Sequence, residues 1–142
     1  SEAREQLNES NESIREKFDQ LKRMQINPIV CVGESLQVKE TEKTKDHLRN
    51  QLSVLDSETE DLIVAYEPIW AIGTGLVPTE KEIDEAIGSI REIFKKPIKV
   101  LYGGSVKASN AQILLDNTDI NGLLVGGASL NPQEFAKIAQ LC

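Results

Sequence analysis

Four short apolar runs alternate with helix-like segments along this chain, and this alternation limits the possible folds more than any other feature. The runs cover residues 29–32, 62–66, 98–102 and 122–125. Each run is apolar on both faces, as strands are when other layers cover both sides of a sheet. Strands that alternate with helices form parallel sheets with the helices outside. The sequence therefore predicts an α/β fold with four parallel strands in one domain of 142 residues.

The segments between the runs carry helix signals. An apolar stripe at spacings of three and four residues predicts a helix over 11–25, and a polar segment with helical period predicts another over 38–53. Thr79, with a glutamate three residues later, forms a capping box and marks a helix start. Further helices are expected over 109–116 and from Asn131, a favoured N-cap residue that precedes a proline.

Several single side chains can be assigned a structural role from their surroundings. Cys31 lies in an apolar run and is expected to be a buried small hydrophobic residue. His47 lies among charged residues and is expected at the solvated surface. The last helix is expected to pack Phe135, Ile138 and Leu141 against the core.

The second strand ends abruptly in an acid. Glu67 follows the apolar run, and Pro68 comes next, which donates no ladder hydrogen bond and favours an extended residue before it. Residues 69–72 are too apolar for an ordinary loop, and 73–75 form a glycine-rich tip. This pattern indicates a lid that closes over a site and excludes water. Taken alone, Glu67 is equally consistent with a solvated acid at a strand end.

Glycine pairs follow the third and fourth strands. Residues 103–105 and 126–127 each lead from a strand towards a helix. Glycine lets the backbone approach a ligand closely, and free N–H groups at a helix start bind anions. One such pair is a weak signal, because tight turns use glycine often. Two pairs in successive loops at the carboxyl ends of parallel strands indicate a phosphate site.

Charge and hydropathy exclude some classes of protein. A net charge of −7 argues against a nucleic-acid partner, which requires a basic surface. No apolar run approaches the roughly 20 residues of a membrane-spanning helix. The charged segment 1–23 does not look like a signal peptide. The two cysteines form no disulfide framework, so a reducing cytoplasm is expected.

The motifs together resemble one family. The string 65–75 resembles the catalytic strand and mobile lid of the triosephosphate isomerase family. Residues 102–105 and 124–130 resemble the family's seventh and eighth loops, in the same order. Residues 31–34 look like its fifth strand end, and 1–4 look like the stretch directly after its catalytic histidine.

The resemblance implies a fold, a reaction and a set of site residues. The chain would be the C-terminal half of a (β/α)8 TIM barrel, with residues 1–142 running from just after the fourth strand to the last helix. Glu67 would be the catalytic base that interconverts dihydroxyacetone phosphate and glyceraldehyde 3-phosphate through an enediolate. Backbone amides would bind the substrate phosphate at Gly73, Ser105, Gly126 and Gly127. The resemblance implies no metal and no cofactor, and a homodimer for the full-length family.

The chain also departs from the family pattern. A full barrel of this kind needs about 250 residues. The family's catalytic lysine, asparagine and histidine, which come from the first half of the barrel, are absent from residues 1–142. We therefore expect a part of a longer enzyme, with no isomerase turnover from these residues alone. Pro78 stands at the far hinge of the lid, where alanine is more usual, and is expected to set the following helix start.

Two other interpretations stay open. The glycine loops are also compatible with a different phosphosugar enzyme built on a barrel. A non-catalytic half-barrel that binds phosphate ligands, or that pairs with a partner chain, is a third possibility. Glu67 argues against this last interpretation, because a binding protein has no use for a base at that position.

Overall fold

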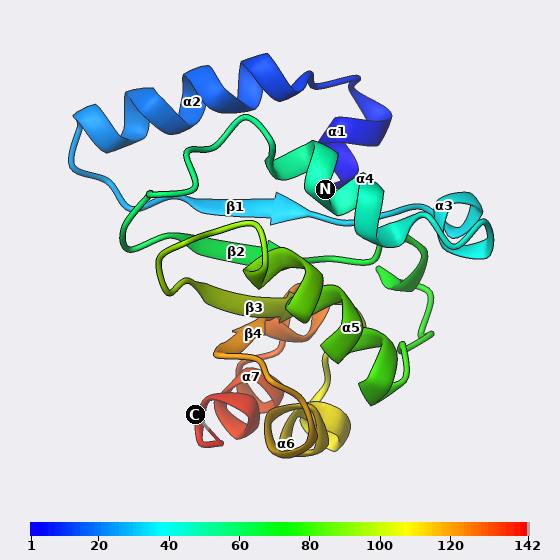
Figure 1. The fold of residues 1–142 in the computed structure, drawn as a ribbon. Helices are drawn as coiled ribbons and strands as arrows, with labels where there is room; N and C mark the ends of the chain where they lie inside the picture. The colour runs from blue at the N-terminus through cyan, green and yellow to red at the C-terminus, as the bar shows by residue number, and fades with distance from the viewer. Residues whose placement is uncertain (142) are drawn as a thin grey trace.

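A four-stranded parallel sheet forms the centre of the molecule. The computed structural model describes residues 1–141, and its strands pair in chain order, as Figure 1 shows. The strands are β1 (Ile29–Val32), β2 (Ile63–Tyr66), β3 (Lys99–Gly103) and β4 (Gly122–Leu124). Every pairing between neighbours is parallel. The α/β fold with four parallel strands that the sequence predicts is therefore confirmed.

Helices connect the strands and cover one face of the sheet (Figure 1). The α-helices are α1 (Glu2–Gln6), α2 (Asn11–Arg23), α3 (Leu36–Glu40), α4 (Thr44–Leu52), α5 (Glu80–Arg91), α6 (Ala108–Asn117) and α7 (Pro132–Ala139). Two short 3-10 helices, η1 (Ile69–Ala71) and η2 (Gly127–Leu130), follow β2 and β4. The described residues contain no helix long and apolar enough to cross a membrane.

The helix expected over 38–53 is in fact two helices. Between α3 and α4, Glu42 adopts a left-handed backbone with φ of 56°. The Thr41 hydroxyl donates to the carbonyl oxygens of Gln37 and Val38, which closes the end of α3. A left-handed non-glycine residue breaks the helical path, although the polar period continues through it. The prediction of one continuous helix was wrong for this reason. The short α1 was not predicted at all.

The capping signals act as the sequence predicts. The Thr79 hydroxyl accepts a hydrogen bond from the Glu82 amide at 3.3 Å, and the Glu82 carboxylate accepts one from the Thr79 amide at 2.8 Å. At the last helix, the Asn131 side chain accepts from the amides of Gln133 and Glu134. These contacts fix where α5 and α7 begin, and therefore where the loops before them end.

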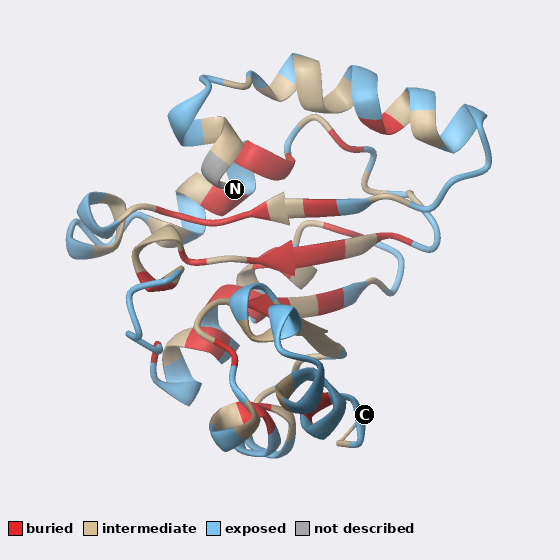
Figure 2. Cartoon of the chain, turned by 180° about the vertical axis from the view of Figure 1, so that it is seen from behind, coloured by how far each residue is buried: buried red, intermediate tan, exposed pale blue. Residues whose placement is uncertain are grey.

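The core lies between the sheet and its helices. On the helix-facing side of the sheet, alternate strand residues are buried, namely Val30, Val32, Val64, Tyr66, Val100 and Tyr102. They pack with α4 and α5 residues including Leu48, Leu52, Ile83, Ile87 and Ile90. The opposite face is apolar but only partly covered: Ile29 is 44% exposed, and Cys31, Ile63 and Leu101 are half-buried. Figure 2 shows β1 and β2 from this side, with no helix in front of them.

Three side chains differ from the sequence-based expectation. Phe135 is 43% exposed, whereas Ile138 on the same helix is buried. Cys31 is half-buried because it lies on the less covered face of the sheet. His47 is also half-buried, and its Nε2 lies 3.0 Å from Nε2 of Gln51, so it is not a free surface histidine.

We predict that Thr79→Ala lowers the free energy of unfolding by about 1 kcal/mol, because it removes a side-chain cap from α5. Chemical denaturation of the natural protein that contains residues 1–142 measures this change. Ser109→Ala, at an exposed position inside α6, serves as the control and should leave stability almost unchanged. Equal stability of Thr79→Ala and the parent protein would show that the cap contributes nothing.

Candidate functional site

The backbone of Glu67 is fixed against the end of β1. Its amide donates to the carbonyl oxygen of Val32 at 2.7 Å. A Cβ atom on Gly33 would lie 1.7 Å from the Glu67 carbonyl oxygen, so no other residue fits there. The end of β2 therefore lies in close contact with the end of β1, and the position of Glu67 is set by the glycine that directly follows β1.

The side chain of Glu67 packs on the end of β3. A Cβ atom on Gly103 would lie 2.7 Å from Glu67 Cγ, closer than real side-chain carbons approach. On the opposite side, the Ser1 hydroxyl donates to Glu67 Oε1 at 3.2 Å. The side chain is 19% exposed. The carboxylate is thus held at the carboxyl edge of the sheet but remains accessible.

A neutral thiol lies beside this carboxylate. Burial, followed by the charge of Glu67, raises the pKa of Cys31 to about 11. The thiol therefore stays protonated at neutral pH and adds no second negative charge next to Glu67.

The lid, defined here as residues 69–78, is attached to the loop after β3 by one hydroxyl. Ser105 Oγ donates to the Ala71 carbonyl oxygen at 2.7 Å and accepts from the Gly75 amide at 3.2 Å. Gly73 and Gly75 have φ values of 68° and 81°, which favour glycine. The resemblance implies a role for the Ser105 amide in binding phosphate, whereas the contact that the structure shows is between the Ser105 hydroxyl and the lid.

A buried carboxyl group supports the start of the lid. Glu34 follows β1, is 1% exposed, and accepts hydrogen bonds from Trp70 Nε1 at 3.0 Å and from the Tyr66 hydroxyl at 3.1 Å. Burial raises the pKa of this carboxyl, whereas the Trp70 hydrogen bond lowers it. This role of Glu34 cannot be predicted from the sequence, because an acid after a short strand carries no signal of burial.

The glycine loops meet around one cavity. A cavity of about 550 Å³ lies between the lid, the loop after β3 and the start of η2. Its lining includes Gly73, Ser105 and Gly127, which are three of the four residues predicted to bind phosphate. Gly126, the fourth, is exposed and directly precedes the lining residue Gly127.

Two polar side chains also line this cavity. Lys107 adds a positive charge at its edge, and Glu134 Oε1 accepts a hydrogen bond from the Ala108 amide at 2.8 Å. One of the free backbone N–H groups in the first turn of α6 therefore already has a carboxylate as its hydrogen-bond partner. Glu67 does not line the cavity, but it packs on Gly103, which directly precedes the lining residue Gly104.

The arrangement defines a class of protein. An acid at the carboxyl end of one parallel strand, with a lid after it and glycine loops after the next two strands, is the arrangement of a (β/α)-barrel enzyme with its site at the strand ends. A sequence model of the family described as triosephosphate isomerase matches residues 1–142, and the chain belongs to this family.

Individual relatives agree with this assignment. A triosephosphate isomerase of Synechococcus sp. (strain JA-2-3B'a(2-13)) is 43% identical over 141 residues, covering 97% of this chain and 56% of the relative. That of Alkaliphilus oremlandii is 40% identical over 151 residues, covering 97% and 61%. That of Mesomycoplasma hyorhinis is 43% identical over 143 residues, covering 99% and 59%. The chain therefore spans between 56% and 61% of the length of these relatives.

We predict that Gly103→Ala in the natural protein displaces the Glu67 side chain and lowers any activity that depends on it. A shift of this kind costs on the order of 100-fold in rate, since catalytic groups tolerate little misplacement. Steady-state kinetics measure the effect. Gly88→Ala is the matched control, because a Cβ atom there meets nothing within 4 Å. Full activity of Gly103→Ala would show that the close approach does not position the acid.

We further predict that Ser105→Ala weakens the attachment of the lid. The variant loses two hydrogen bonds, each worth about 1 kcal/mol, so we expect kcat/KM to fall about tenfold or more. Ser89→Ala on α5 removes a hydroxyl that bonds only within its helix and should change little. A kcat/KM equal in both variants would contradict a role of the Ser105 hydroxyl in holding the lid.

Proposed function

We propose that the natural protein containing residues 1–142 is a triosephosphate isomerase, which interconverts dihydroxyacetone phosphate and D-glyceraldehyde 3-phosphate. The observation that carries the proposal is the position of Glu67, fixed between two glycines at the carboxyl edge of the sheet and next to the glycine-lined cavity. Membership of the family supports the same reaction. The enzyme would act in glycolysis and gluconeogenesis, in the cytoplasm.

Glu67 would be the base. Its carboxylate would take a proton from the carbon beside the substrate carbonyl. The electrons of the broken C–H bond would form the C=C bond of the enediolate, and the π electrons of the carbonyl would move to its oxygen. Return of the proton to the former carbonyl carbon, together with transfer of the hydroxyl proton from one oxygen to the other, would complete the isomerisation. A free glutamate, with a pKa of about 4.3, is a weak base, so a site that excludes water is needed to raise its basicity. Closure of the lid would provide that exclusion.

The glycine loops would hold the substrate phosphate. Backbone amides of Gly73, Ser105, Gly126 and Gly127 would supply the hydrogen bonds, and a chain with net charge −7 can bind an anion in this way. The lid residue and the loop residues lie around one cavity, so phosphate bound there would contact both. Bound phosphate would thus favour the closed lid.

Residues 1–142 would form the part of a (β/α)8 barrel that runs from just after the fourth strand to the last helix. Among the described residues, the outer edges of β1 and β4 have no strand partner, and Ile29 and Leu101 lie on a partly covered apolar face. Further strands would pair with those edges and cover that face. The remaining strands would also bring the group that polarises the carbonyl, by resemblance a histidine directly before Ser1. Ser1 already contacts Glu67, which supports this placement.

The oligomeric state of the full-length protein would be that of the family. We propose a homodimer for the full-length protein, in which a loop of the first half of the barrel would provide most of the contact.

We predict that Glu67→Gln in the natural protein lowers the isomerisation rate by two to four orders of magnitude, the usual contribution of a positioned base. Coupled assays in both directions measure this loss. Glu60→Gln changes an exposed acid that precedes β2, at the opposite end of this strand from Glu67, and as the control it should keep full activity. Residues 1–142 alone should show no turnover. Isomerisation that survives Glu67→Gln would instead favour a different phosphosugar enzyme.

A further inference from the structure

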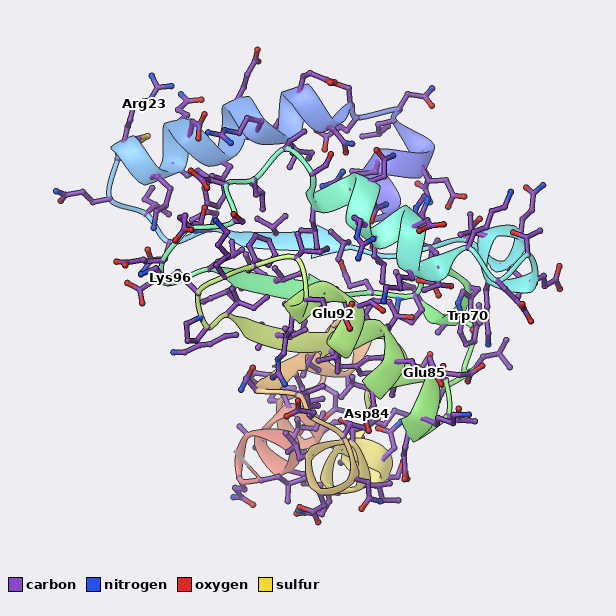
Figure 3. The ribbon with its side chains drawn as sticks, viewed as in Figure 1. Arg23, Trp70, Asp84, Glu85, Glu92 and Lys96 are labelled. Carbon is purple, nitrogen blue, oxygen red and sulfur yellow. The ribbon has the colours of Figure 1, made fainter. Side chains whose placement is uncertain are left out.

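Lys39 contacts structures at both ends of the lid. It lies on α3, and its Nζ is 3.7 Å from the centroid of the Trp70 ring at the start of the lid. The same Nζ is 2.8 Å from Glu82 Oε1, in the first turn of the helix that follows the lid. Figure 3 shows Trp70 between α3 and the N-terminal half of α5. One ammonium group therefore bridges the start of the lid and the helix that follows the lid.

Trp70 is held by two contacts, one at the edge of its indole ring and one at its face. The indole N–H donates to the buried carboxyl of Glu34, while the ammonium of Lys39 lies over the face of the ring. An edge contact and a face contact together fix both the position and the tilt of the indole. A cation over an indole face is attracted by the ring quadrupole.

The carboxylate of Glu82 connects Lys39 to the residue that follows the lid. Glu82 Oε1 binds Lys39, and its Oε2 accepts from the amide and the hydroxyl of Thr79 at 2.8 and 2.9 Å. Thr79 is the N-cap residue of α5 and follows the lid directly. The hydrogen bond from Lys39 is the main reason that the pKa of Glu82 falls to about 2. The carboxylate is therefore charged at neutral pH.

Space is present for these side chains to move. An open cavity of about 750 Å³ lies between α3, α4 and α5, and its lining includes Glu34, Lys39, Trp70 and Glu82. Lys39 itself is 30% exposed. The indole can therefore shift with the lid on this side without first displacing packed core residues.

We propose that Lys39 is a positioning residue for the lid, acting through Trp70 and Glu82. It sets the orientation of Trp70 and its placement relative to the start of α5, and so limits the positions from which the lid closes. The proposal rests on the proposed isomerase function for its kinetic consequence, but the contact with Trp70 does not depend on it. Lys39 touches neither Glu67 nor the glycine-lined cavity among the described contacts, so it is not a catalytic residue.

Lys39→Gln in the natural protein tests this role, with Lys39→Arg as the conservative variant. Lys45→Gln is the matched control, because Lys45 lines the same cavity but pairs with Glu92 at 2.8 Å. Trp70 is the single tryptophan of residues 1–142, and subtraction of a Trp70→Phe protein isolates its fluorescence. The readouts are acrylamide quenching of Trp70, kcat/KM and the melting temperature.

We expect Lys39→Gln to increase quenching of Trp70 and to lower kcat/KM about two- to fivefold, the range of a cation–π contact at an exposed site. Lys39→Arg and Lys45→Gln should stay close to the parent protein in both readouts. The melting temperature should be similar in all variants, which separates positioning from general destabilisation.

Unchanged quenching and unchanged kinetics in Lys39→Gln would overturn the proposal, as would an equal loss in Lys45→Gln. If Lys39→Gln does not fold, Glu82→Gln provides the test, since glutamine at this position keeps the capping box but removes the charged partner of Lys39. A parent protein without isomerase activity would refute the proposed function alone. The quenching comparison would then still decide whether Lys39 positions Trp70.

Discussion

The site depends on the close approach of Glu67 to its two neighbouring strands. Glycine at position 33 admits the Glu67 backbone, and glycine at position 103 admits its side chain. Neither contact supplies much attraction by itself. Their effect is to leave only one place for the carboxylate, at the edge where the parallel strands end. The lid and the glycine loops then take their positions from the same strand ends, so that the proposed base, its cover and the proposed anion site all lie at one edge of the sheet.

The lid is held by side chains from three other segments. Ser105 contacts two of its backbone groups, Glu34 binds the indole edge of Trp70, and Lys39 covers the indole face. These contacts come from the loop after β3, the end of β1 and α3 respectively. The left-handed glycines Gly73 and Gly75 lie at the tip of the lid, where the chain must turn. A cover that is held at its base, and also at Gly75 of its tip, can exclude water without being part of the core.

Much of this architecture could be predicted from local sequence. The four strands, the capping box at Thr79 and the glycine loops depend on residues close to one another in the chain. The break between α3 and α4 at Glu42 could not be predicted, since glutamate has no preference for a left-handed backbone. The roles of the Ser105 hydroxyl and of Lys39 were equally hidden, because each depends on contacts between residues about 30 or more positions apart. Family membership is now established, whereas the roles of Glu67, Gly73, Ser105, Gly126 and Gly127 stay predictions.

The protonated thiol of Cys31, beside Glu67, affects how readily this cysteine is oxidised or alkylated. A pKa of about 11 for Cys31 leaves roughly one molecule in ten thousand as thiolate at neutral pH. Peroxides and alkylating agents react with the thiolate, so this cysteine is expected to be inert despite its place near the Glu67 carboxylate. Burial of the thiol, followed by the charge of the nearby Glu67 carboxylate, therefore protects this sulfur from oxidative damage by making its ionisation unfavourable.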